Sequence, residues 1–97
     1  MKIRITKVPD GSAPERVRAA WIGLELEALP MPENEPEVDL LSLSIKAGRG
    51  GCVVSVEDSL EILKQKNHEA YNWFVENIPP QMPCFSFGPD EYEIVGL

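Results

Sequence analysis

Several short stretches of the chain alternate apolar and polar residues, which is the pattern of a half-buried β-strand. Ile3 and Ile5 alternate with charged residues in residues 2–8, and residues 22–28 repeat the alternation with Gly and Glu between the apolar positions. The same period occurs in residues 41–46, and further short apolar runs occupy residues 52–56, 84–87 and 92–95. We therefore predict about five or six short strands, with the glycine-rich residues 47–51 forming the turn of a hairpin between 41–46 and 52–56.

One part of the chain carries helical signals instead. Ser55 and Asp58 have the spacing of a helix start, and apolar residues then recur at helical intervals. The sequence predicts a helical segment over residues 56–77, which the proline pair at 79–80 brings to an end. Asn67 leaves two alternatives open: one unbroken helix, or two helices with Asn67 ending the first and capping the second.

These elements predict a single α+β domain over residues 1–97, because a chain of 97 residues is too short for two independent cores. The expected fold is a small bent antiparallel sheet, or a partly open barrel, with the helical segment packed on it. A short helical turn in residues 15–20 and a solvated, acidic, proline-rich loop in residues 30–39 complete the prediction. The expected core residues are Ile3, Ile5, Ile22, Leu24, Leu26, Leu43, Ile45, Val54, Leu60, Leu63, Ala70, Phe74, Phe85 and Ile94.

The end of the chain has the order strand, tight turn, strand, with the turn tetrapeptide Gly88-Pro89-Asp90-Glu91 between the last two runs. This order resembles the end of an SH3-like small barrel, and the long loop after the first strand is also similar to that group. The resemblance implies a partly open SH3-like barrel as the fold. The ligand-binding aromatic residues of eukaryotic SH3 domains have no match here, so the resemblance implies no functional site.

Charge is distributed unevenly along the chain. Residues 1–20 contain five basic and two acidic side chains, whereas residues 21–39 contain six acidic side chains and no basic one. This distribution favours a basic first strand beside an acidic second strand; the alternative is a bipolar molecule that self-associates or binds a basic partner.

The formal net charge of −7 argues against binding to nucleic acid or to an anionic membrane surface. No apolar run approaches the ~20 residues that span a bilayer, and the first residues lack the apolar run of a secretion signal, so we expect a cytoplasmic protein.

No group of polar side chains has the spacing that a known catalytic or metal site requires. The glycines of residues 48–51 lead into a strand rather than a helix, so they predict a turn and not a phosphate loop. The acidic residues 33–39 lack the glycine and the closing glutamate of a calcium loop. Cys52 and Cys84 fit buried positions better than a disulfide or a thiol–imidazole pair with His68. The sequence therefore predicts no catalytic residue, no cofactor and no metal ion.

Three aromatic residues are the candidates for a functional surface. Trp21 falls on the polar side of its predicted strand, and Trp73 lies one position off the apolar helical stripe, close to Tyr71. If they are exposed, they form an apolar patch suited to a partner. We therefore predict a small non-catalytic protein-interaction module or subunit with an acidic surface, whose partner is another protein or a second copy. The alternative is a small-molecule-binding protein or minor enzyme with a pocket between sheet and helix, in which the polar groups are Cys84, His68 and Tyr92.

Overall fold

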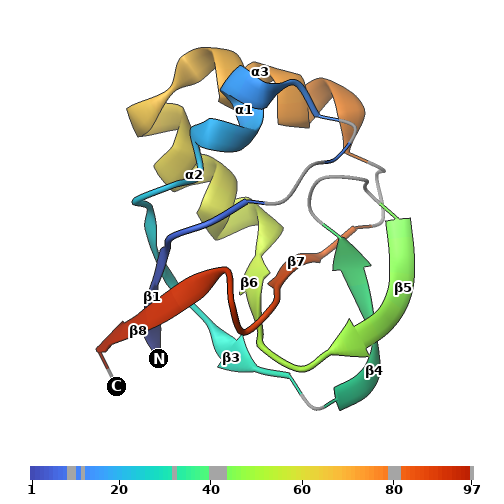
Figure 1. Ribbon diagram of the computed structural model, residues 1–97. Helices are drawn as coiled ribbons and strands as arrows, with labels where there is room; N and C mark the ends of the chain where they lie inside the picture. Colours follow the sequence, from blue (N-terminus) through green and yellow to red (C-terminus); the bar gives the residue numbers. More distant parts are fainter. Residues whose placement is uncertain (9–10, 12, 32, 40–43, 79–81, 97) are drawn as a thin grey trace.

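The computed structural model describes residues 1–8, 11, 13–31, 33–39, 44–78 and 82–96. These residues form eight strands and three helices, which gives an α+β fold in which the helices gather at one end of the molecule and the strands at the other (Figure 1). The radius of gyration is 12.2 Å, within the range of about 12–13 Å expected for a folded chain of this length.

The first and last strands belong to one antiparallel sheet of three strands. Its order is β2-β1-β8, with β1 at Lys2–Ile5, β2 at Glu25–Glu27 and β8 at Tyr92–Gly96. Ile3 and Ile5 of β1 are fully buried, whereas Arg4 points to the other face. There Arg4 forms ion pairs with Glu25 of β2 at 3.0 Å and with Glu93 of β8 at 2.6 Å. The predicted pairing of a basic first strand with an acidic second strand is confirmed.

The second sheet has the order β3-β6-β7-β4-β5, with β3 at Leu29–Pro30, β4 at Glu33–Asp39, β5 at Ser44–Arg49, β6 at Cys52–Ser55 and β7 at Cys84–Phe87. Its strands β3, β6 and β7 are antiparallel, and the β4–β5 hairpin joins them through one parallel pair, Asp39 with Ser86. Only Ala28 separates β2 from β3, so one extended segment serves both sheets. The described strands form no closed barrel, so the expectation of an SH3-like barrel is not confirmed.

Two strand predictions are wrong. The acidic residues 33–39 form β4 rather than a solvated loop, and β4 pairs with β5 in a register that sets Glu37 opposite Lys46. As a consequence, residues 44–49 do not form the predicted hairpin with residues 52–55. Strand β6 pairs with β7 instead, where Val54 stands opposite Phe85, a combination of β-branched and aromatic residues that stabilises neighbouring strands. The glycine turn itself is present, since Gly50 and Gly51 both have positive φ.

The helices follow the local signals of the sequence. They are α1 at Glu15–Ala19, α2 at Val56–Lys66 and α3 at His68–Asn77. Ser55 caps α2, because its hydroxyl accepts a hydrogen bond from the backbone N–H of Asp58. The side-chain oxygen of Asn67 accepts from the N–H of Ala70 at 3.0 Å, so the alternative with two helices is the correct one. Within the described residues, no helix combines the length and apolar character that a membrane crossing needs.

The core lies between the two sheets and the helices. Among the predicted core residues, nine are buried: Ile3, Ile5, Leu24, Leu26, Val54, Leu63, Ala70, Phe74 and Phe85. Leu60 is partly buried against this cluster, and Leu43 and the side chain of Ile45 lie outside the described residues. Ile22 and Ile94 were expected in the core but are 44% and 53% exposed. Ile22 precedes the strand in a turn around Gly23, whose φ is +89°, and Ile94 lies on the edge strand β8.

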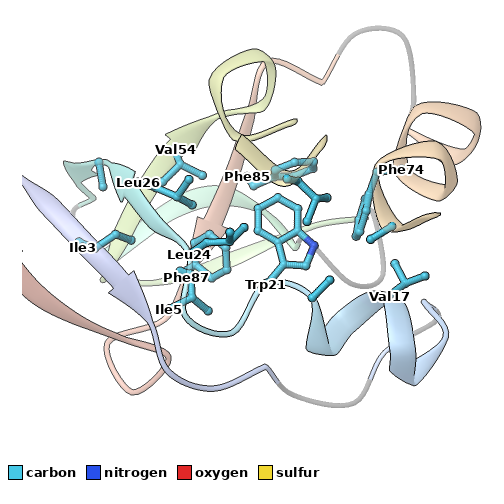
Figure 2. Packing of buried hydrophobic residues seen from close by; sticks show 14 of the residues in the cluster. Ile3, Ile5, Val17, Trp21, Leu24, Leu26, Val54, Phe74, Phe85 and Phe87 are labelled. Carbon is cyan, nitrogen blue, oxygen red and sulfur yellow. The ribbon is translucent and has the colours of Figure 1, made fainter. Parts of the chain in front are cut away.

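Trp21 lies at the centre of the core, surrounded by three phenylalanines (Figure 2). Its ring meets Phe74 and Phe85 edge-on, at centroid distances of 5.4 and 5.6 Å, and Phe87 at 6.1 Å. The prediction that Trp21 lies on the polar side of a strand is therefore wrong, and Trp21 is not part of an exposed patch. The turn at residues 20–23 explains the error, because it interrupts the alternation and directs both Trp21 and Leu24 inward.

Candidate functional site

Helix α3 presents aromatic side chains on both sides of its buried face. Ala70 and Phe74 are buried, and at 100° per residue Tyr71 and Trp73 lie on opposite flanks of that face. Trp21 belongs to the core instead, so the three aromatic residues predicted to share a partner surface do not form one patch. Tyr71 and Trp73 face different neighbours, and their surroundings differ in charge.

The Tyr71 flank is directed toward the end of α2. The Nζ atom of Lys64 lies over the Tyr71 ring, 5.3 Å from its centroid, which is a cation–π contact. The imidazole of His68 stacks at a tilt against the same ring, with centroids 5.7 Å apart. Tyr71 thus already has a cationic neighbour within the chain, so its face is less accessible to an incoming group.

The Trp73 flank borders an open groove between α1 and α3, which we call the α1–α3 groove. It has a volume of about 440 Å³ and is lined by Arg16 and Val17 of α1 and by His68, Glu69, Asn72, Trp73 and Glu76 of α3. Trp73 is half-buried because one edge packs against Phe74, at a centroid distance of 4.9 Å. This contact fixes the indole while leaving part of it open to the groove.

The charges of the α1–α3 groove are unequal. Arg16 bonds to Glu69 across the groove, with Nε and Oε1 2.9 Å apart, and this ion pair ties α1 to α3. Glu76 is exposed and has no ion-pair partner among the residues that the structure describes. The groove therefore offers an aromatic ring and one carboxylate that is not engaged by a cation. Sequence reasoning found Trp73 but missed Arg16, Asn72 and Glu76, because no local signal indicates that α1 packs against α3.

The polar groups of the alternative small-molecule pocket do not come together. His68 lines the α1–α3 groove, whereas Cys84 lines a separate pocket of about 300 Å³ that borders both sheets and the start of α2. Tyr92 interacts with a third residue, Cys52, through a side-chain hydrogen bond. Each of the three predicted groups thus lies in a different environment.

Cys52 has the properties of a core residue rather than of a nucleophile. It is fully buried, and burial raises the pKa of its thiol to about 11. Burial likewise raises the pKa of the Tyr92 phenol. Because the thiolate is the reactive form of cysteine, a thiol with this pKa is almost entirely unreactive near neutral pH. Within the described ranges, no three His, Cys, Asp or Glu side chains are grouped so that they could hold a metal ion.

Comparison of the chain with models of protein families, with curated proteins and with solved structures gives no significant match in any of the three. The geometry of the α1–α3 groove is therefore the basis on which a function is proposed.

Proposed function

We propose that this protein is a non-catalytic interaction module, and that its α1–α3 groove binds a lysine or arginine side chain of a partner protein. The observation that carries the proposal is the half-buried ring of Trp73 in an open groove beside the carboxylate of Glu76. A tryptophan face attracts a cation through its quadrupole, and tryptophan is enriched where proteins bind one another.

The charge of the groove favours a cationic occupant over the alternatives. Glu69 is already neutralised by Arg16, so Glu76 is the carboxylate that remains for an incoming group. An anionic ligand would meet Glu76 and the net charge of −7. A purely apolar ligand would remove water from Glu76 without giving it a partner, which is unfavourable. A lysine or arginine side chain provides both an apolar stem and a charge.

The expected strength of one such contact is small. A cation–π contact at an exposed site contributes about 0.5–1 kcal/mol, and an exposed ion pair contributes up to about 1 kcal/mol. A single side chain is therefore expected to bind in the millimolar range or more weakly, so a natural partner needs further contacts around the groove. The net charge also leads us to propose that nucleic acid is not the partner.

Nuclear magnetic resonance can test the groove with short capped peptides. The peptides Gly-Ser-Lys-Ser-Gly and Gly-Ser-Arg-Ser-Gly are titrated into ¹⁵N-labelled protein, and the indole N–H of Trp73 and the side-chain amide of Asn72 are followed. We expect both signals to shift with the basic peptides, and the shifts to shrink with added salt because the interaction is partly ionic. A norleucine peptide of the same length tests the need for charge.

Two glutamate variants separate the groove from the general acidity of the surface. Glu76→Gln should weaken binding of the basic peptides about 2- to 5-fold, whereas Glu57→Gln, an exposed acidic residue in the first turn of α2, should leave it unchanged. In an affinity pull-down, the wild type and Glu57→Gln should capture partner proteins that Glu76→Gln does not capture. The proposal is wrong if the norleucine peptide binds as well as the lysine peptide, or if neither basic peptide shifts the Trp73 signal.

A further inference from the structure

The α1–α3 groove has two ends that differ in charge, and their separation follows from the spacing of residues on α3. Glu69 and Glu76 are seven positions apart, so their Cα atoms lie about 10.5 Å apart along the helix axis and on nearly the same face. Asn72 and Trp73 come between them, and all four residues line the groove. Arg16 of α1 pairs with Glu69 at one end. The carboxylate of Glu76 defines the other end.

Arg16 uses only part of its hydrogen-bonding capacity. Its Nε donates to Glu69 Oε1 at 2.9 Å, and its two terminal nitrogens form no hydrogen bond or ion pair with any residue that the structure describes. The Arg16 side chain is 67% exposed, so an incoming group can reach the guanidinium. A guanidinium commonly binds a carboxylate through two of its nitrogens. A second carboxylate can therefore bind Arg16 without displacing Glu69.

We propose that the partner segment bound in the groove carries an acidic residue three positions from its basic residue, and binds in a polyproline II conformation. This inference rests on the proposed function, in which the basic side chain pairs with Glu76 beside Trp73. Residues i and i+3 of a polyproline II helix lie on the same face, about 9.3 Å apart, which is close to the separation of the two ends. In a β-strand, residues three apart point to opposite faces. The acidic side chain pairs with Arg16.

A second basic residue is the alternative occupant of the Arg16 end. It would have to displace Arg16 from Glu69, and it would thereby exchange one exposed ion pair for another of similar strength. The displaced guanidinium would then lie near the new positive charge. An acidic residue instead keeps the existing ion pair and adds hydrogen bonds to it. The charges of the groove therefore favour a segment with one charge of each sign over a segment with two basic residues.

Two capped peptides that differ in one group test this inference by nuclear magnetic resonance. Gly-Lys-Pro-Pro-Glu-Gly and Gly-Lys-Pro-Pro-Gln-Gly share the lysine and the proline pair, which favours polyproline II. The indole N–H of Trp73 and the Nε–H of Arg16 are followed in ¹⁵N-labelled protein. We expect both peptides to shift the Trp73 signal, and only the glutamate peptide to shift the Arg16 signal. The wild type should bind the glutamate peptide about 2- to 5-fold more tightly than the glutamine peptide.

Three variants show whether this preference depends on Arg16. Arg16→Gln should reverse the preference, because Glu69 then repels the peptide's glutamate. Glu69→Gln should increase the preference, because Arg16 is no longer neutralised, whereas simple damage to the groove would weaken both peptides. Lys2→Gln is the matched control, since it also removes one positive charge, but from an exposed residue of β1. It should leave the preference unchanged.

The outcomes separate this inference from the proposed function. Equal binding of the two peptides to the wild type overturns the inference alone, since both peptides carry the lysine. The inference is also overturned if Arg16→Gln and Glu69→Gln keep the wild-type preference, or if Lys2→Gln changes it as much as Arg16→Gln does. If neither peptide shifts the Trp73 signal, the inference and the proposed function are both wrong.

Discussion

Replacement of Trp21 tests whether the aromatic cluster is the centre of this fold. Trp21 has no exposed surface and meets three phenylalanine rings within 6.1 Å. Its indole nitrogen is also buried, and none of the described residues forms a hydrogen bond with it. The side chain therefore combines a large favourable packing contribution with one unfavourable buried donor, and two substitutions can separate these contributions.

Trp21→Ala removes the whole ring and leaves a cavity among the phenylalanines. Large-to-small replacements of buried aromatic residues cost about 3–5 kcal/mol. A domain of this length has a total stability of roughly 5–15 kcal/mol, so the variant is expected to lose a large part of it.

Trp21→Phe keeps a ring in the cluster and removes the unpaired N–H. The smaller ring should cost roughly 1–2 kcal/mol in packing, and removal of a buried unpaired donor should return about 1–3 kcal/mol. The two effects oppose each other, so we expect a free energy of unfolding between about 1 kcal/mol below and about 2 kcal/mol above that of the wild type.

Urea unfolding followed by far-ultraviolet circular dichroism measures both variants, with Trp73 fluorescence as a second probe. Equal m-values for wild type and variants would show that the comparison concerns the same two states. The reasoning is refuted if Trp21→Ala costs less than about 1 kcal/mol, since the ring would then not be central. It is also refuted if Trp21→Phe is as destabilising as Trp21→Ala, since the N–H would then have a partner.

Three further predictions concern single features of the fold. Asn67→Ala removes the cap of α3 and should lower the free energy of unfolding by about 0.5–2 kcal/mol, which urea unfolding measures; Asn67→Ser should recover most of the loss. Gly51→Ala should be far more destabilising than Gly23→Ala. Both glycines have positive φ, which costs an alanine about 1–2 kcal/mol, but only at Gly51 would the new Cβ overlap a backbone oxygen, that of Phe87. Equal thermal melting points for the two variants would contradict this. Because the pKa of Cys52 rises from 9.0 unfolded to about 11 folded, its contribution to stability is complete below pH 9 and is lost as the pH rises through 11. Urea unfolding at a series of pH values measures this effect. Between pH 9 and 11 the free energy of unfolding should fall more steeply for the wild type than for Cys52→Ala. Parallel pH profiles of the two proteins would contradict a raised pKa of Cys52.

The sequence by itself determined the features that depend on neighbouring residues. The alternation around Ile3 and Leu26 predicted their burial, because side chains of a strand point to alternate faces. Ser55 and Asn67 marked the starts of two helices, because a cap acts on a backbone N–H three residues away. The turn at residues 88–91 was also predicted, and in it the N–H of Gly88 donates to the Glu91 carboxylate at 2.7 Å.

Only the tertiary structure decided which elements meet. The choice of β7 rather than β5 as the partner of β6 depends on strands about 30 residues apart in the chain, and no local pattern records it. The α1–α3 groove likewise depends on Arg16 and Glu69, which are 53 positions apart. Trp21 was placed on the wrong side because one turn shifted the alternation by a residue, and a shift of one residue reverses the face of a strand.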